Sequence, residues 1–235
     1  MARPRRILTG FRASYRAHCT RERPGHEAHA RPPRHPETDT DMPALLRLIA
    51  HASTRAMRTG TFPDDEPLDA RGLAEAAAHR ERRAGIADAR VLCSPARCAR
   101  QTADALGLHP DIDAMLREID YGRWRGRRLQ DLGRDCPNEL RAWIGDPSAS
   151  PHGGESFDEA MRRAGAWLNR LPHERDIVAI THATIVRAVI ANVLRADART
   201  VSGIDIAPLS CTTFAHTPEG WMPIADDDRS DRRSG

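Results

Sequence analysis

Two histidines each close a short apolar run in this sequence. His51 ends the run that starts at Leu45, and His182 ends the run that starts at Asp176. A neutral imidazole can serve as nucleophile, general base, hydrogen-bond donor or metal ligand. The two runs predict buried strands, and ligands of open α/β sheets bind beyond the carboxyl ends of the strands. We therefore expect two imidazoles that are distant in sequence to share one pocket.

Two other interpretations of these histidines compete with catalysis. A single histidine at a strand end is often a structural residue that is held by a hydrogen bond. Metal binding is the second alternative, but no Asp or Glu neighbours either histidine at ligand-like spacing. We therefore expect no metal and no other cofactor. The five cysteines form no CxxC pair and leave one unpaired, which favours reduced thiols in a cytoplasmic protein over a disulfide framework.

The elements that must position these side chains alternate between strand and helix. Strands are predicted at Leu45–Ala50, Val91–Cys93 and Asp176–Thr181, and a hairpin at Cys211–Ala215 and Trp221–Ile224. Helices are predicted over Arg71–Ala84 and after His182 through Leu194. A third helix is predicted to start at Pro95 with Ser94 as its N-cap. A fourth is predicted from the capping box Ser156–Glu159 to about Leu171. This alternation predicts an α/β fold, a three-layer α/β/α sandwich with a mainly parallel central sheet.

Composition separates the two ends of the chain from its middle. The 235 residues include no lysine, so all 36 basic residues are arginines, which weakens each arginine as a functional signal. Residues 1–41 carry nine arginines and five acids, and no sustained apolar period. We expect 1–41 to be a disordered or non-native extension with translation starting at Met42, 42–225 to be the folded domain, and 226–235 to be a disordered tail.

The charge balance and the lengths of the apolar runs limit the classes of partner that the chain could bind. The remainder of the chain holds 27 basic and 28 acidic residues, so bulk attraction to nucleic acid is not supported. No run approaches eighteen apolar residues, so no membrane span is predicted. Neither nucleic acid nor a membrane is therefore an expected partner. A homodimer is left open.

Five segments, in order, carry a family resemblance. They are Ala50-His51-Ala52-Ser53-Thr54, Pro67–Gly72, Ser94–Ala103, Leu116–Gly126, and Gly153-Gly154-Glu155-Ser156 joined to Thr181-His182-Ala183. In this order and spacing the chain resembles the histidine phosphatase superfamily, in its phosphoglycerate mutase-like branch, from about Leu45 to Ile224. The Gly153–Ser156 run has two equally weighted interpretations, a turn with a helix cap or a part of the substrate mouth.

The resemblance implies a set of roles. His51 would attack phosphorus and form a phosphohistidine, which water then hydrolyses. Glu118 would protonate the leaving alkoxide and then deprotonate the water. His182 would donate a hydrogen bond to the phosphoryl oxygens, and no metal would be needed. Thr54 and Ala183 would lie among the phosphate-binding groups.

Two departures from the family pattern concern its phosphate-binding arginines. The family's arginine before the nucleophile is Ala50 here, the glycine after it is Ala52, and the second pocket arginine is Cys98. An arginine finger in phosphoryl transfer is worth about 10³–10⁵ in rate. The substitutes that the sequence offers are Arg58, the preferred one, and Arg97, followed by Arg55 and Arg100.

Three functions therefore follow from the resemblance. The first is a metal-independent phosphomonoester hydrolase with a rebuilt arginine set, and its expected partner is a small phosphorylated substrate. The second is a catalytically impaired relative that binds an anionic ligand. The third and weakest is a phosphoglycerate mutase, because no segment indicates a lid that would exclude water from the phosphoenzyme.

Overall fold

The computed structural model describes residues 43–80 and 88–224, which form a mixed α/β fold. Its six-stranded sheet has the order β3-β2-β4-β1-β5-β6. The strands are β1 (Leu45–Ala50), β2 (Arg90–Cys93), β3 (Asp111–Ile112), β4 (Ile177–Thr181), β5 (Cys211–Thr217) and β6 (Gly220–Ile224). Strands β3, β2, β4 and β1 pair in parallel, and only the pairings of β5, with β1 and with β6, are antiparallel within the described residues.

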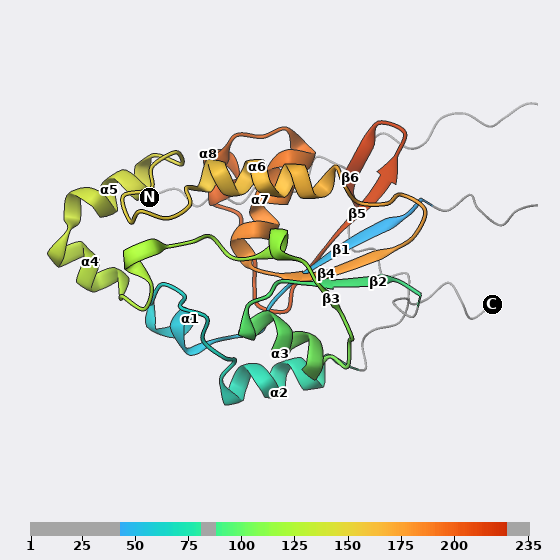
Figure 1. Ribbon diagram of the computed structural model, residues 1–235, viewed down its shortest axis with the longest axis horizontal. Coiled ribbons are helices and arrows are strands. Elements are labelled where there is room, and N and C mark those ends of the chain that lie inside the picture. The colour runs from blue at the N-terminus through green and yellow to red at the C-terminus, as the bar shows by residue number, and fades with distance from the viewer. Residues whose placement is uncertain (1–42, 81–87, 225–235) are drawn as a thin grey trace, which may run out of the picture. The chain divides into compact units, whose positions relative to one another are not determined.

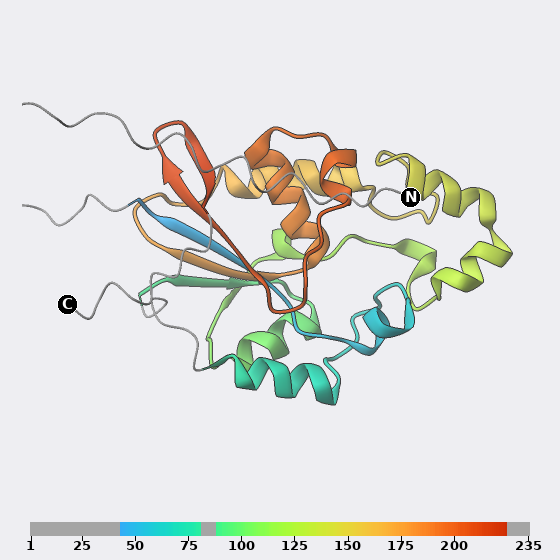
Figure 2. The ribbon, with the colours of Figure 1, turned by 180° about the vertical axis from the view of Figure 1, so that it is seen from behind.

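Helices cover both faces of this sheet, as predicted. Figure 1 shows one layer below the sheet and a second layer above it. The lower layer is α2 (Ala70–Ala78) and α3 (Arg97–Ala105), and the upper layer is α6 (Phe157–Leu168), α7 (Ala183–Leu194) and α8 (Ala198–Ser202). The view from behind in Figure 2 gives the same separation. The predicted three-layer α/β/α sandwich is therefore confirmed.

The remaining helices lie beyond the carboxyl ends of β1 and β4. They are α1 (Arg55–Thr59), α4 (Leu129–Asp135) and α5 (Pro137–Gly145), and Figure 1 shows them beside the end of the sheet at which the two histidines emerge. Two short 3-10 turns, Ala114–Leu116 and Gly122–Trp124, frame the segment that carries Glu118. The long connections thus gather on one side, where the site must lie.

Local sequence signals set most of the predicted boundaries. Strand β1 has the predicted ends, and α7 ends at Leu194 as expected. Ser156 and Glu159 form the predicted capping box at the start of α6, which ends at Leu168, three residues before the predicted end. Helix α2 begins one residue early and ends at Ala78, and the predicted stop at Gly85 lies outside the described residues.

The prediction that Ser94 caps a helix starting at Pro95 is wrong. Helix α3 begins at Arg97, with Ala96 as its N-cap. The backbone N–H of Ser94 still donates to the carbonyl of Ile180 (2.9 Å), so the chain continues the ladder beyond β2. The Ser94 hydroxyl accepts the N–H of Ala96 (3.2 Å), the residue before α3, and lies 2.8 Å from Nε2 of His182.

The core consists of aliphatic side chains packed on both faces of the sheet. The five residues of β4 are all buried, as expected for a strand that lies between two parallel neighbours and under helices on each face. Trp167, Phe214 and Leu116 are among the largest fully or nearly fully buried side chains of the upper layer. This rigid centre fixes the ends of β1 and β4, from which the two histidines emerge.

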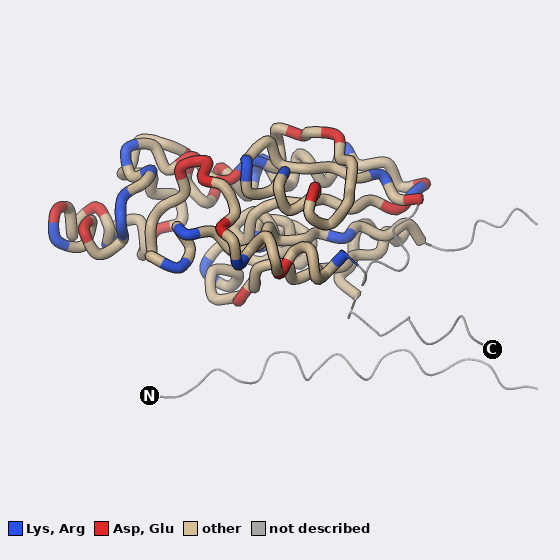
Figure 3. The backbone as a smooth tube through the Cα atoms, turned by 90° about the horizontal axis from the view of Figure 1, so that it is seen from below, with Lys and Arg blue, Asp and Glu red and all other residues tan. Residues whose placement is uncertain are grey.

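The charged residues of the folded part are mixed in sign. Figure 3 shows arginines and acidic residues interspersed along the described backbone. No helix among the described residues is long and apolar enough to cross a bilayer. The predicted extension 1–41 and tail 226–235 lie outside the described residues.

Candidate active site

The sheet register brings His51 and His182 together. Ala50 of β1 pairs with Thr181 of β4, and each histidine is the next residue on its strand. The His51 N–H donates to the Thr181 carbonyl (2.8 Å), which extends the parallel ladder by one residue. The two imidazole rings lie 5.0 Å apart between centroids, with planes at 68°. Two side chains that are distant in sequence therefore meet at the end of the sheet.

The surroundings of His51 define which ring nitrogen is available. Its Nδ1 lies 2.8 Å from the carbonyl oxygen of Ala52, and a carbonyl only accepts, so Nδ1 carries the proton. Burial lowers the pKa of His51, which outweighs the hydrogen bond to Ala52 and the nearby Glu66. The ring is therefore neutral at physiological pH, with a lone pair on Nε2.

His182 is almost completely buried between two partners. Its Nε2 lies 2.8 Å from the Ser94 hydroxyl, and its Nδ1 lies 3.6 Å from a carboxylate oxygen of Glu118. Burial lowers the pKa of His182 well below its usual value, and His51 and Arg163 lower it further. We therefore assign a neutral imidazole here, held in orientation from both sides.

Glu118 occupies a site that favours its protonated form. Burial raises the pKa of this carboxyl to about 7. Hydrogen bonds from the Ile119 N–H and the Thr184 hydroxyl lower the pKa, as do the charges of Arg163 and Arg187, but burial is the larger effect. Its segment is attached to the sheet because the hydroxyl of Thr181 donates to the Leu116 carbonyl (2.8 Å). A carboxyl group with this pKa can give and take a proton near neutrality.

The Gly153–Ser156 run packs against the segment that carries Glu118. The Glu155 N–H donates to the Asp120 carbonyl (2.8 Å). A Cβ on Gly154 would lie 1.9 Å from that same carbonyl oxygen, so only glycine fits. The Glu155 carboxylate holds the Arg163 guanidinium through two nitrogens, at 2.8 and 2.7 Å. The run is thus both a helix cap and a support for the Glu118 segment.

Cys98 lies next to both histidines. Its sulfur and one nitrogen from each of His51 and His182 lie within 4.8 Å of one another. Burial raises the pKa of the Cys98 thiol to about 12, and the carboxylates of Glu66 and Glu118 add to this. The position that the family resemblance assigns to an arginine therefore holds a buried neutral thiol.

Of the predicted phosphate-binding arginines, Arg58 and Arg55 lie on α1, and both are exposed. Arg58 forms an ion pair with Asp69, the N-cap of α2. Arg55 lines a surface pocket of about 290 Å³. The preferred substitute for the arginine missing at Ala50 thus has an acidic partner of its own.

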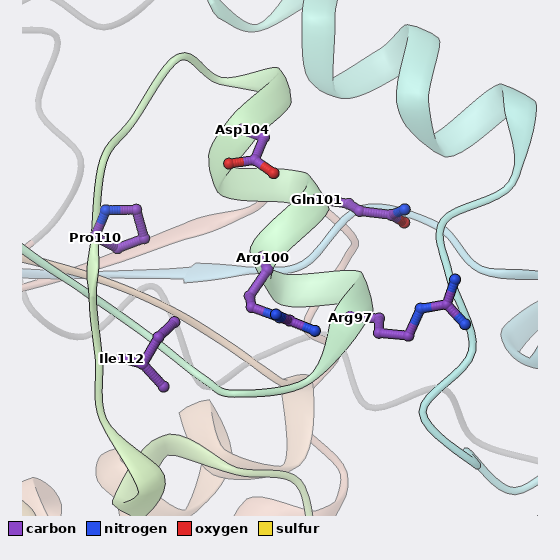
Figure 4. Close-up of a pocket in the computed structure, with 6 residues that line it drawn as sticks. All are labelled: Arg97, Arg100, Gln101, Asp104, Pro110 and Ile112. Atoms are coloured by element: carbon purple, nitrogen blue, oxygen red, sulfur yellow. The ribbon is translucent and has the colours of Figure 1, made fainter.

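Arg97 and Arg100 line a different pocket, of about 350 Å³, with Gln101, Asp104, Pro110 and Ile112. Figure 4 shows both side chains leaving the start of α3. Neither histidine is among the residues that line this pocket. A helix turns by about 100° per residue, so Arg97 leaves α3 in a different direction from Cys98.

The two small predicted residues have distinct environments. Thr54 is fully buried, accepts the Met57 N–H as N-cap of α1, and donates its hydroxyl to Glu66 (3.0 Å). Ala183 is the first residue of α7, directly after His182. That helix has His182 as N-cap and no side-chain capping bond, so no side chain caps its first N–H groups.

Sequence reasoning missed several side chains of this site. The sequence predicts Ser94 as a helix cap and assigns no role to Thr184 or Tyr121, whereas the Thr184 hydroxyl bonds to both Glu118 and Tyr121. Arg163 was also missed, and it acts on both Glu118 and His182. The Thr-His-Ala-Thr run was the one available signal for Thr184.

Comparison with known proteins gives one family. The model of the histidine phosphatase superfamily (branch 1) matches residues 46–225. Among curated relatives, a bifunctional protein of Mycobacterium tuberculosis is 29% identical over 186 residues, which are 73% of this chain and 50% of that protein. The adenosylcobalamin/alpha-ribazole phosphatase of Escherichia coli is 29% identical over 159 residues, which are 63% of this chain and 78% of that protein.

A third curated relative and a solved structure also resemble this chain. This chain spans only about half the length of the first curated relatives. The glucosyl-3-phosphoglycerate phosphatase of Mycobacterium tuberculosis is 28% identical over 120 residues, 45% of this chain and 54% of that protein. A solved structure described as a putative alpha-ribazole-5'-P phosphatase from Escherichia coli has a TM-score of 0.70 at 23% identity, covering 77% of this chain and 95% of its own. That likeness supports the phosphoglycerate mutase-like fold.

Proposed function

Because the chain belongs to the histidine phosphatase superfamily, we propose that it hydrolyses a small phosphomonoester through a phosphohistidine on His51. The observation that carries the proposal is the group of His51, His182 and Glu118, with ring centroids 5.0 Å apart and a 3.6 Å contact between His182 and Glu118. Similarity to phosphatases of small phosphorylated metabolites supports the substrate class.

The first step is phosphoryl transfer to the protein. The Nε2 lone pair of His51 attacks phosphorus, and the bond from phosphorus to the ester oxygen breaks. Glu118 gives its proton to the leaving oxygen, so the alcohol departs neutral and the carboxyl becomes a carboxylate. A pKa of about 7 leaves much of Glu118 protonated at neutral pH, which suits this role.

The second step returns the protein to its starting state. The Glu118 carboxylate takes a proton from a water molecule, whose oxygen attacks the phosphohistidine phosphorus. The bond from phosphorus to Nε2 breaks, inorganic phosphate leaves, and His51 and Glu118 are restored. No metal takes part, because fixed hydrogen-bond donors stabilise the transferring group.

The donors available for the phosphoryl oxygens differ from the family pattern. The N-terminus of α7 offers the Ala183 N–H next to His182, and helix N-termini favour anions. Arg58 would take part only after exchanging Asp69 for phosphate. Because Ala50 and Cys98 stand where the family has its two phosphate-binding arginines, we expect turnover well below that of an enzyme that has both arginines.

Release of p-nitrophenol from p-nitrophenyl phosphate tests the proposal. We expect hydrolysis by the native protein that EDTA does not reduce, and loss to background in His51→Ala. His109→Ala is the matched control, because His109 is exposed and outside the site. Equal release by the native protein and His51→Ala would rule out the phosphohistidine route.

A second candidate function is binding of an anionic ligand without turnover. Ala50 and Cys98 favour it, since they stand where the family has the arginines that stabilise the transferring phosphoryl group. The N-terminus of α7, which has no side-chain cap, still offers N–H donors to an anion. Calorimetric titration with inorganic phosphate distinguishes the two. Phosphate binding together with no hydrolysis of any phosphomonoester would favour the binding function.

A further inference from the structure

We infer that His51, Cys98 and His182 form a binding site for Zn²⁺. Each residue offers one ligand atom, and the three atoms lie within 4.8 Å of one another. Among the described residues this is the one group of three or more histidine, cysteine and acidic side chains with that spacing. The inference concerns a binding event, and it stands whether or not the protein hydrolyses phosphomonoesters.

The donor types suit zinc. Imidazole nitrogen and thiolate sulfur are the ligands that Zn²⁺ prefers, so binding would convert the neutral Cys98 thiol to a thiolate and release its proton to solvent. Three protein ligands leave a fourth position for water. Zinc bonds of about 2.0–2.3 Å place tetrahedral ligand atoms roughly 3.5 Å apart. From separations within 4.8 Å, the three atoms therefore need to approach by up to about 1.3 Å to bind one ion.

The histidines are already oriented as metal-binding histidines usually are. Such residues donate their second ring N–H to a carbonyl or carboxylate, which fixes the ring. Nδ1 of His51 donates to the Ala52 carbonyl, leaving Nε2 as the ligand. His182 has Ser94 on one nitrogen and Glu118 on the other, so whichever nitrogen binds the metal, the other has a partner.

The local charge favours a cation at this position. Glu66, Glu118 and Asp65 are the charged groups that act most strongly on Cys98, and all three are acidic. Arg163 and Arg187, the two arginines that act on Glu118, are held by Glu155 and by the Ile204 carbonyl. Where a phosphate-binding arginine is expected, the chain thus presents a soft ligand surrounded by carboxylates.

Metal binding and phosphoryl transfer would exclude each other. A zinc ion on Nε2 of His51 occupies the lone pair that attacks phosphorus, so the metal acts as an inhibitor of the proposed phosphatase. His51 is partly accessible, whereas Cys98 and His182 are buried, so the metal would enter from the side of His51.

Titration of the full chain with Co²⁺ tests the site directly, because Zn²⁺ is spectroscopically silent and Co²⁺ accepts the same ligands. We expect a sulfur-to-cobalt charge-transfer band that saturates at one equivalent and is displaced by Zn²⁺. The band should be retained in Cys93→Ala, the matched loss of a buried thiol, and absent in Cys98→Ala and Cys98→Ser. Histidines and Cys19 in residues 1–41 are common to all variants, so they cancel in the comparison.

His51→Gln supplies a second test that leaves the thiol in place. We expect it to weaken Co²⁺ binding at least tenfold while circular dichroism shows a folded protein. No charge-transfer band in the native protein, an equal band in Cys98→Ala or Cys98→Ser, or unchanged affinity in His51→Gln would each overturn the inference. None of these readouts depends on hydrolysis, so failure of the proposed function leaves the test intact.

Discussion

Nδ1 of His182 lies 3.6 Å from Oε2 of Glu118. This contact joins the end of β4 to the segment between the two 3-10 turns, and it places a carboxyl group beside the imidazole pair. The His182 side chain is 3% exposed and that of Glu118 is 18% exposed. Burial raises the pKa of the carboxyl to about 7 and lowers that of the imidazole. A neutral imidazole beside a carboxyl that titrates near pH 7 is what general acid–base chemistry at neutral pH needs.

Replacing Glu118 with glutamine should separate proton donation from binding. An alkyl phosphate such as glycerol phosphate has a poor leaving group and needs the proton, whereas nitrophenolate leaves without one. We expect kcat/KM for glycerol phosphate to fall about 10²–10⁴-fold and that for p-nitrophenyl phosphate to fall much less. The control is Glu139→Gln, which changes an exposed acid. Equal losses on both substrates would contradict proton donation.

The pH dependence follows from the same carboxyl. Only protonated Glu118 can serve as the acid, so kcat/KM for an alkyl phosphate should decline as the pH rises through about 7. On the acid side, the pKa of His51 is lowered, so the nucleophile stays neutral to a pH below the usual pKa of histidine. A pH series on the native protein and Glu118→Gln checks this. If the decline of kcat/KM above pH 7 persists in Glu118→Gln, the decline is due to another group.

Ser94 is expected to position His182. Its hydroxyl lies 2.8 Å from Nε2, so Ser94→Ala should lower kcat on the order of tenfold with little change in KM, since one hydrogen bond is worth about 1 kcal/mol. Ser94→Thr, which keeps the hydroxyl, should recover part of kcat. Ser210→Ala is the control, because that buried hydroxyl has no hydrogen-bond partner among the described residues. Equal effects of the two alanine substitutions would mean that the Ser94 contact is irrelevant.

Arg163 should matter for stability far more than its neighbour Arg162. The Arg163 side chain is 9% exposed and its partner Glu155 is 11% exposed. Arg163→Ala leaves the nearly buried Glu155 carboxylate with only the 3.5 Å contact to Arg117, which we expect to cost about 3 kcal/mol of unfolding free energy. Arg162 is 76% exposed, so Arg162→Ala should change it by less than about 0.5 kcal/mol. Urea denaturation measures both, and similar values would contradict the role of the ion pair.

Local patterns predicted the elements well where tertiary contacts did not intervene. The apolar run of β1 and the capping box of α6 are self-contained signals, and both occur as predicted. The Ser-Pro signal placed the start of α3 two residues early, at Pro95 instead of Arg97. The Ser94 hydroxyl accepts the Ala96 N–H and also contacts the histidine that follows β4, and no local pattern records the second contact. The meeting of His51 and His182 followed from strand topology, a rule that acts over the whole sheet.

The rest of the site depends on side-chain neighbours that spacing does not reveal. Arg58 was preferred for its place after His51, and the competing carboxylate of Asp69 is visible only in the fold. Cys98 was read as a missing arginine, whereas its distance to two imidazoles makes it a metal ligand candidate. The thiol belongs to α3 and the imidazoles follow β1 and β4, so no local spacing in the sequence joins the three side chains.

The most direct test of the central proposal is detection of the phosphoryl group on His51. Native protein is mixed with p-nitrophenyl phosphate, quenched in alkali to preserve phosphohistidine, digested, and mapped by mass spectrometry. The account predicts one phosphoryl group on the peptide that contains His51 and none in His51→Ala. Product release with no phosphorylated peptide, or with the phosphoryl group on a different residue, would contradict it.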